Sequence, residues 1–248
     1  MSMSEATFRF YEELNDFLLS DRRKVDFQCG FKGRESVKDM IEALGVPHTE
    51  VDLILVNGTS VDFEYILQDG DRISVYPVFE SLDIADVTHL REIPLRETRF
   101  IADVNIHDIV TYMRALGLDV YLDPTLSPSD IIRISEEEKR TILTKSRKLL
   151  KHREVSHGIF IRPGTLVQQI RAIVDFLSLH KKVAPFSRCL RCNNPLVRVS
   201  KESVFDRIPP KARAFYDEYS YCSACDRIYW KGTHFVKIKE VVDEILAH

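Results

Sequence analysis

Four cysteines in the last quarter of the chain form the clearest chemical pattern in the sequence. Cys189 and Cys192 make one CxxC pair, and Cys222 and Cys225 make a second pair after 29 intervening residues. Two such pairs fold as knuckles that place four thiolates tetrahedrally around a zinc ion. Four protein ligands close the coordination shell, so we expect a structural zinc whose removal unfolds the surrounding segment. The alternative is four reduced or disulfide-bonded cysteines, and reducing conditions disfavour disulfides.

Basic and aromatic residues are interleaved beside the second pair, in the segment Asp226-Arg-Ile-Tyr-Trp-Lys-Gly-Thr-His-Phe235. This pattern is typical of surfaces that stack the bases of single-stranded nucleic acid and contact its phosphates. Arg227, Trp230 and Lys231 are therefore candidate nucleic-acid contacts. The alternative is that the aromatic side chains simply pack the zinc-binding segment.

Charge is distributed unevenly along the chain, although the formal net charge of the 248 residues is only -3. Residues 1–80 hold 8 Lys and Arg against 16 Asp and Glu, whereas residues 139–239 hold 22 against 7. A strongly basic region predicts a polyanionic partner such as RNA, and the acidic region predicts a separate protein partner. A solubilising surface is the alternative reading of both.

Composition excludes several classes of protein. With 44% hydrophobic residues the chain can bury a sizeable core and is not disordered. The nine glycines form no GxGxxG dinucleotide loop, and no GxxxxGK[ST] phosphate loop is present. No run of 18 apolar residues and no apolar signal core occurs, so we expect a cytoplasmic globular protein without membrane contact.

The first eighty residues predict a small β-grasp domain. Strands are expected at 7–11, 24–31 and 51–57, a turn with a last strand at 68–77, and a helix at 36–45. Ser36 and Asp39 can cap the start of that helix, and Gly45 can end it. Asn57-Gly58 predicts a tight turn between strands.

Residues 53–80, LILVNGTSVDF through LQDGDRISVYPVFE, resemble the ubiquitin-like sulfur carriers of thiamine and molybdopterin synthesis. Those carriers end in an exposed Gly-Gly whose carboxylate is activated. Here the matching end reads Val78-Phe79-Glu80-Ser81 and the chain continues. We therefore interpret residues 1–80 as an interaction or regulatory domain, because the carrier chemistry has no reactive group.

After a predicted linker at 81–98, short strands alternate with helices through residues 99–183. The pattern predicts strands at 99–103, 120–122, 141–144 and 158–161, and helices at 106–116, from Ser127, at 147–152 and at 165–179. Such alternation favours a three-layer α/β domain with a mostly parallel sheet. Ligand sites in these sheets lie at the carboxyl ends of the strands, where Asp103 and Ser146 are expected.

The segments RFIADVNIHDIVTYMRALGLDVYL, RTILTKSRKLLKH and SRCLRCNNPL through CSACDRIYWKGTHF resemble the bacterial Mut-seven C-terminal RNase family. That family joins a PIN-like nuclease domain to a zinc ribbon, and some members carry a ubiquitin-like domain in front. The resemblance implies a β-grasp domain at 1–80, a PIN-like domain at 99–183, and a zinc ribbon with a C-terminal tail at 184–248.

The resemblance also implies carboxylates that bind Mg²⁺ or Mn²⁺ at the edge of the sheet. Asp103 matches the acid that ends the first strand, and Asp130 matches an acid near the second helix, although Asp130 can equally be half of a capping box with Ser127. A further expected Asp is replaced by Ser146. Loss of that charge should weaken Mg²⁺ binding.

Neighbouring residues offer further candidates for this site. Asp108, Asp119 and Asp123 are possible substitutes for the missing acid, and we expect additional nucleic-acid contacts from Lys145, Arg147 and Lys148.

Three functions follow from the sequence. The first is a metal-dependent RNA-cleaving nuclease with a degenerate acidic site. The second is a catalytically inactive RNA-binding or adaptor protein on the same fold, which Ser146 favours. The third is a role in protein interaction alone, which the basic region disfavours.

Overall fold

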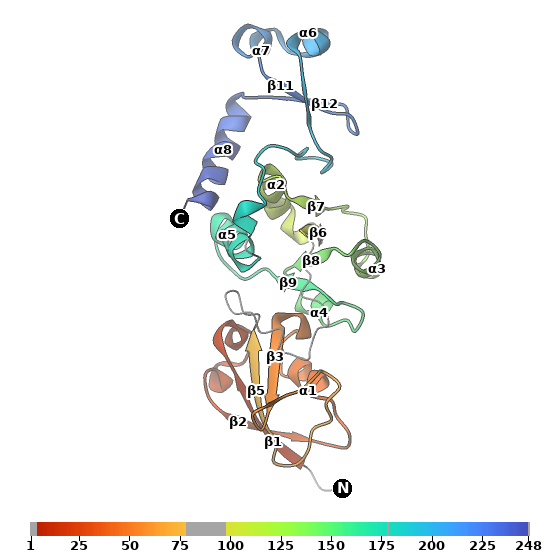
Figure 1. The fold of residues 1–248 in the computed structure, drawn as a ribbon, viewed down its shortest axis with the longest axis vertical. Helices are drawn as coiled ribbons and strands as arrows, with labels where there is room; N and C mark the ends of the chain where they lie inside the picture. Colours follow the sequence, from red (N-terminus) through yellow and green to blue (C-terminus); the bar gives the residue numbers. More distant parts are fainter. Residues whose placement is uncertain (1–3, 78–97, 178, 248) are drawn as a thin grey trace. The chain divides into compact units, whose positions relative to one another are not determined.

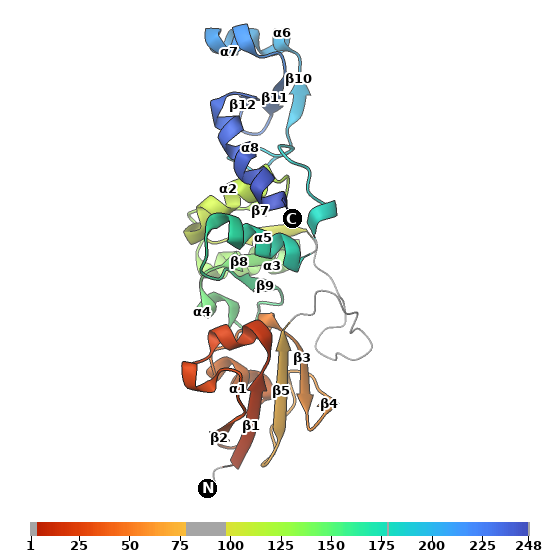
Figure 2. The same cartoon turned by 90° about the vertical axis from the view of Figure 1, so that its left-hand side faces the viewer.

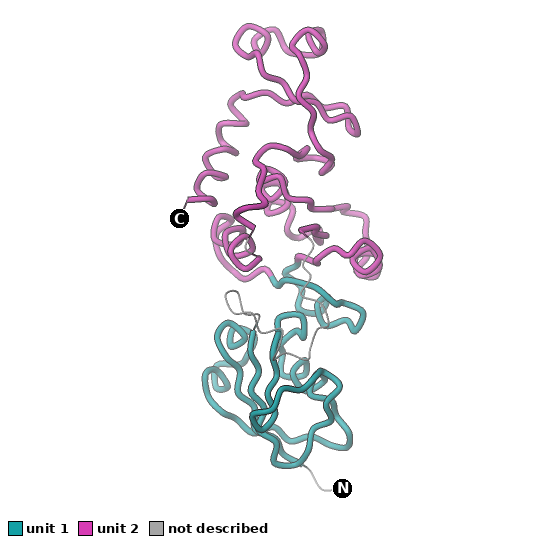
Figure 3. The backbone as a smooth tube through the Cα atoms, in the orientation of Figure 1, with its two compact units in different colours: residues 1–96, 144–160 teal, residues 97–143, 161–248 magenta. Residues whose placement is uncertain are grey.

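The computed structural model describes residues 4–77, 98–177 and 179–247, and the chain divides into two compact units (Figure 3). Unit 1 comprises Met1–Arg96 and Thr144–Phe160, and unit 2 comprises Glu97–Leu143 and Ile161–His248. The predicted linker at 81–98 lies outside the described residues, apart from residue 98. The segment 144–160, which we expected inside the nuclease-like domain, groups with unit 1.

A mixed five-stranded sheet forms the body of unit 1, with the strand order β2-β1-β5-β3-β4 (Figure 2). β1 runs parallel to β5, and the other neighbouring pairs are antiparallel. The strands are β1 (Ser4–Phe10), β2 (Phe27–Phe31), β3 (Val51–Val56), β4 (Thr59–Ser60) and β5 (Arg72–Pro77). This arrangement confirms the predicted β-grasp fold and adds the short β4.

Local signals set the helix and the main turn of unit 1 as the sequence predicted. In α1 (Val37–Ala43), the Ser36 hydroxyl accepts a hydrogen bond from the Asp39 amide at 3.1 Å. Asn57 and Gly58 both have positive φ, 51° and 84°, which the tight turn between β3 and β4 requires. Residues 4–77 also contain the 3₁₀ helices η1 (Glu12–Phe17), η2 (Ser20–Arg22) and η3 (His48–Glu50).

The segment 144–160 is a structural part of unit 1. It contains α4 (Arg147–Leu150) and β9 (Gly158–Phe160). The Phe160 ring packs against the core of the unit, and its amide donates to the buried Glu50 carboxylate at 2.8 Å. The Arg147 guanidinium carbon lies 4.8 Å from the ring centroid of Phe17 and 5.3 Å from that of Phe160. Apolar, polar and cation–π contacts therefore all join this segment to residues 1–77.

Within unit 2, three parallel strands lie in the order β7-β6-β8, with β6 in the middle (Figure 1). They are β6 (Arg99–Ala102), β7 (Asp119–Tyr121) and β8 (Thr141–Thr144), whose last residue belongs to unit 1. The helices around them are η4 (Val104–Ile106), α2 (His107–Ala115), α3 (Pro128–Glu138), α5 (Leu166–Phe176) and η5 (Leu179–Lys181). This confirms the predicted α/β class with a parallel sheet.

An antiparallel ribbon follows in the same unit, with strand order β10-β11-β12. Its elements are β10 (Val197–Val199), α6 (Lys201–Val204), η6 (Phe205–Arg207), α7 (Pro210–Phe215), β11 (Tyr219–Cys222) and β12 (Arg227–Trp230). Prolines open α7, as the sequence indicated.

The ribbon is followed by a helix, α8 (Thr233–Leu246), which the sequence analysis did not predict. It runs beside α2 and α5 (Figure 2). Its Val242 and Ile245 are buried. The Arg171 guanidinium on α5 donates to the carbonyl of Ile245. No helix in the described part of the chain is both long and apolar enough to cross a bilayer.

Candidate functional site

The four cysteines predicted to bind zinc come together at the ribbon. Their sulfur atoms all lie within 4.8 Å of one another, with 3.4 Å between Cys189 and Cys225 and 3.3 Å between Cys192 and Cys222. A tetrahedral zinc with Zn–S bonds of about 2.3 Å places its sulfurs about 3.8 Å apart. Among the described residues, these four are the one group of three or more His, Cys, Asp or Glu ligand atoms close enough to hold a metal ion.

Both knuckles have the same backbone feature, which sequence reasoning missed. Asn193 and Asp226, the residues directly after each CxxC pair, adopt left-handed φ values of 69° and 58°. Asn and Asp tolerate this conformation better than other residues with a Cβ. In the first knuckle the Asn193 amide donates to the Cys189 carbonyl at 2.9 Å. An Asn or Asp directly after each CxxC pair was the available signal.

The thiols of the cluster have unlike acidities. Burial, together with hydrogen bonds to the neighbouring thiols, raises the pKa of Cys225 to about 12. Burial also opposes ionisation of Cys192, but hydrogen bonds from the Asn194 amide and from Cys222 outweigh it and lower its pKa to about 6. Four thiolates at this spacing therefore need a cation, and an all-sulfur tetrahedral donor set fits zinc.

A buried arginine fixes the first knuckle to the parallel sheet. Arg114, at the end of α2, is 4% exposed, and its Nε donates to the Val120 carbonyl at 2.9 Å. Its Nη1 donates to the carbonyls of Leu190 at 3.1 Å and Arg191 at 2.8 Å, between the first two cysteines. The position of the cysteine cluster is thus set by the sheet.

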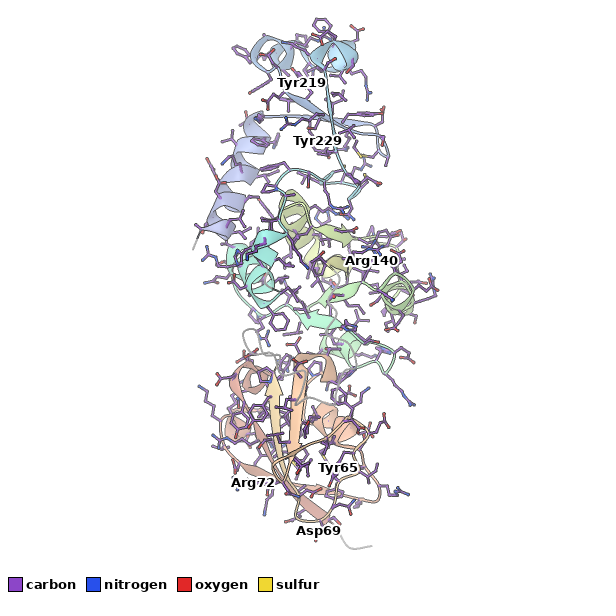
Figure 4. All side chains as sticks on the ribbon, in the orientation of Figure 1. Tyr65, Asp69, Arg72, Arg140, Tyr219 and Tyr229 are labelled. Carbon is purple, nitrogen blue, oxygen red and sulfur yellow. The ribbon has the colours of Figure 1, made fainter. Side chains whose placement is uncertain are left out.

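Asp119 also joins the first knuckle to the parallel sheet; its partner Arg140 is labelled in Figure 4. Its Oδ1 accepts from Arg140 Nη1 at 2.7 Å and from Asn193 Nδ2 at 2.8 Å, and Arg188 Nη2 lies 3.4 Å from its Oδ2. Burial raises the pKa of Asp119, but the hydrogen bonds from Arg140 and Asn193 lower it more, to a value below the usual range. The contacts of this carboxylate therefore join the ribbon to the sheet.

Asp103 lies at the opposite end of the sheet, directly after the central strand β6. Its side chain caps η4 by accepting from the Asn105 amide at 2.8 Å, and the residue is only 7% exposed. Its own amide points to the Leu143 carbonyl on β8 at 3.4 Å. A buried carboxylate at the carboxyl end of a central parallel strand is where the fold class places ligand sites.

Asp130 forms the capping box that the sequence left as an alternative. Its Oδ2 accepts from the Ser127 amide at 3.1 Å and hydroxyl at 2.6 Å, while the Asp130 amide donates back to Ser127. The Ser127 hydroxyl lowers the pKa of Asp130, so the carboxylate is ionised at neutral pH. The Asp108 side chain is 92% exposed beside His107.

Ser146 and its basic neighbours belong to unit 1. The Ser146 hydroxyl caps α4 by accepting from the Leu149 amide at 3.2 Å. Lys145, Arg147 and Lys148 are exposed, and the Arg147 guanidinium also contacts the rings of Phe17 and Phe160 of its own unit. Asp103 and Asp130 belong to unit 2, so the predicted site residues are divided between the two units.

A cavity of about 990 Å³ lies in the ribbon, lined by residues of β10, β11, β12, α7 and the start of α8. Of the predicted nucleic-acid contacts, Trp230 and Lys231 line it, and Arg227 is exposed at the start of β12. Tyr219 and Tyr229, labelled in Figure 4, also line it. Sequence reasoning missed other aromatic residues of the lining, among them Phe186, Phe215 and Tyr216.

Two family models match the chain. The Mut7-C RNAse domain matches residues 98–242, which is more than half of the chain, and the Mut7-C ubiquitin domain matches residues 3–83. No curated protein matches it. Both domains and their order agree with the resemblance seen in the sequence.

Proposed function

Because the chain belongs to the Mut7-C RNAse domain family, we propose that it hydrolyses phosphodiester bonds of RNA in a metal-dependent reaction. The observation that carries this proposal is Asp103, a buried carboxylate at the carboxyl end of the central strand of the parallel sheet. Ligands of open α/β sheets bind outside this end of the strands.

Asp103 would be the main protein ligand for Mg²⁺ or Mn²⁺. Protein sites for Mg²⁺ commonly use one or two carboxylates and complete the shell with water and substrate phosphate, so few acids suffice. When bound, the ion supplies an activated water and offsets charge on the scissile phosphate. The part of Asp103 is to hold a fixed negative charge at this edge, with its orientation set by the Asn105 amide.

Asp130 and Ser146 stand at two positions where the family resemblance implies metal-binding carboxylates. Asp130 would contribute a second carboxylate only by leaving its capping box with Ser127. Ser146 supplies a neutral hydroxyl that caps α4. We therefore propose that the site binds Mg²⁺ or Mn²⁺ weakly, so that cleavage needs a high concentration of the metal ion.

The remaining assignments complete the proposal. The four cysteines hold a structural zinc, and Lys145, Lys148, Arg227 and Lys231 contribute positive charge toward RNA. We place the protein in the cytoplasm, where reducing conditions keep the cysteines available as thiolates. The acidic ubiquitin-like domain is a surface for a protein partner.

A time course of single-stranded RNA cleavage in Mg²⁺ and in Mn²⁺ tests this function. We expect Asp103→Asn to lower the cleavage rate at least 100-fold, or about 3 kcal/mol of activation free energy, because the carboxylate charge is lost. Asn also caps helices well, so the variant keeps the backbone contact to Asn105. Glu137→Gln, an exposed change on α3, is the matched control and should stay within twofold.

Equal rates for the Asp103→Asn variant and the unmodified protein would remove Asp103 from the reaction. Binding of RNA without cleavage by the folded, zinc-loaded protein would instead favour the second candidate, an RNA-binding or adaptor protein. Two observations support that candidate: Ser146 replaces an expected acid, and Asp130 is held in a capping box.

A further inference from the structure

We propose that the ribbon groove binds single-stranded RNA, with bases stacking on its aromatic side chains and phosphates contacting its cations. The ribbon groove is the cavity of about 990 Å³ formed by β10–β12, α7 and the start of α8. The proposal rests on the RNA-directed function above and names the surface that captures the substrate, which is separate from Asp103.

Aromatic side chains in the groove are placed for stacking. Phe215, at the end of α7, is 79% exposed, which is unusual for a large apolar ring. Trp230 packs one part of its side chain against the ribbon core and remains partly exposed. Phe186 and Phe235 hold their ring centroids 4.4 Å apart at the same cavity. A base stacks on any of these rings without regard to sequence.

The backbone at Phe186 is strained. Its φ of 60° lies in the left-handed region, which a bulky side chain rarely occupies. The conformation is held by a hydrogen bond from the Phe186 amide to the Ala115 carbonyl at 2.7 Å. Strain that is retained in this way is typical of ligand sites.

The absence of a side chain at Gly232 leaves the space that the indole ring of Trp230 occupies. A Cβ at position 232 would lie only 2.8 Å from Trp230 Nε1, so any larger residue displaces the ring. The φ of Gly232 is -84°, so the requirement here is for space and not for a special backbone conformation.

The charge of the lining selects a polyanion. Four Arg and Lys residues line the groove against two acids, Asp217 and Glu218. Both acids are neutralised, by Lys201 at 2.8 Å and Lys231 at 2.6 Å. Arg198 and Lys211 are exposed and have no ion-pair partner among the described residues. Exposed cations match phosphates, and exposed rings match unstacked bases. A duplex offers the phosphates but keeps its bases stacked.

The sole tryptophan of the chain, Trp230, makes the test site-specific. The full-length zinc-loaded protein is titrated with a ten-residue oligouridylate while Trp230 fluorescence is followed, without added Mg²⁺ or Mn²⁺ so that binding is separate from cleavage. We expect saturable quenching that weakens steeply as salt is raised. An RNA duplex and an acidic peptide of equal charge should compete at least tenfold less well.

Two variants locate the binding, each with a matched control. Phe215→Ala and Lys211→Ala should each raise the Kd at least fivefold, because one removes a stacking surface and the other a phosphate contact. Phe205→Ala is the aromatic control, since this ring is 46% exposed but lies under Arg213 and outside the groove. Lys237→Ala on α8 is the basic control. Both controls should stay within twofold.

Three results overturn the proposal: no quenching, the same Kd in all four variants, or equal competition by the peptide or the duplex. Cleavage that persists without groove binding would reject the ribbon groove and leave the proposed nuclease standing. Groove binding by a protein that cleaves RNA in neither Mg²⁺ nor Mn²⁺ would support the ribbon groove and reject the proposed nuclease.

Discussion

Asp119 and Asp103 stand at opposite ends of one parallel sheet and have different surroundings. Asp119 opens β7 at the amino end of the sheet and is bound by three side chains, those of Arg140, Arg188 and Asn193. Asp103 follows β6 at the carboxyl end and caps the short helix after it. Both carboxylates are largely removed from solvent.

The difference teaches that burial alone does not mark a chemical acid. The charge of Asp119 is balanced by two guanidinium groups, and its function is to hold the first zinc knuckle against the sheet. A backbone amide orients Asp103 at the edge where the fold class places ligands. One end of the sheet therefore serves architecture, and we assign chemistry to the other.

Loss of the zinc should have the largest effect, because it should unfold the ribbon that is attached to the sheet near Asp119. Cys222→Ser removes a buried thiolate ligand, and structural zinc sites carry much of the folding free energy of their segment, about 10 kcal/mol or more. We expect the bound zinc to fall from one ion per chain to almost none, with new protease cleavage between residues 184 and 232. Elemental analysis and limited proteolysis measure both, with Cys29→Ala as the control; full zinc content in Cys222→Ser would contradict the assignment.

Replacing the two acids in turn should separate stability from chemistry. Asp119→Asn removes the anion that Arg140 and Arg188 share and leaves Arg140 with Glu138 alone, so the free energy of unfolding should fall by about 3 kcal/mol. Asp103→Asn keeps a good helix cap and should change stability by less than about 1 kcal/mol. Urea unfolding followed by Trp230 fluorescence reports on unit 2 for both. Equal losses would remove the distinction between the two ends.

Acid should weaken the architectural end first. The pKa of Asp119 is lowered in the folded protein, so its contribution is complete above the ordinary aspartate pKa of about 3.9 and is lost as pH falls toward the lowered value. The urea midpoint of unit 2 should therefore drop more between pH 5 and pH 3 in the unmodified protein than in Asp119→Asn. Parallel curves would show that this carboxylate is not the source of acid sensitivity.

The smallest effect is expected at the capping box of α3. Ser127→Ala removes the hydroxyl that accepts from the Asp130 amide and should cost about 1 kcal/mol. It also removes the main cause of the lowered pKa of Asp130, which should rise toward the ordinary range. Urea unfolding and NMR titration of the carboxyl carbon measure these changes. Ser129→Ala, at an exposed position in the same turn, should be neutral or slightly stabilising.

Much of the secondary structure could be predicted because its signals are local. Ser36 with Asp39 and Ser127 with Asp130 fixed the starts of two helices, and the bounds of β8 were predicted as observed. The cysteine cluster was predictable from spacing alone. The C-terminal helix also had a signal, the apolar series Phe235, Ile238, Val242 and Ile245, although its first turn overlaps the basic–aromatic motif.

The parts that could not be predicted depend on contacts between distant residues. Asn193 and Asp119 are 74 positions apart, and no local pattern indicates that one carboxylate would join knuckle and sheet. Glu50 and Phe160 are 110 positions apart, and their hydrogen bond helps to place the segment 144–160 in unit 1. The ribbon groove likewise combines β10, α7 and α8, of which only the start of α7 was predicted.

The discontinuity of unit 1 has a consequence for how the chain is made. Synthesis starts at the N-terminus, so residues 97–143, with two complete strands of the parallel sheet, leave the ribosome before the segment 144–160 that groups with unit 1. Until Phe160 emerges, the Glu50 carboxylate lacks the amide that it binds in the finished protein. We therefore expect the two units to mature in an interleaved order, with nascent chains of 1–96 remaining more open to proteases than the same residues in the full-length protein.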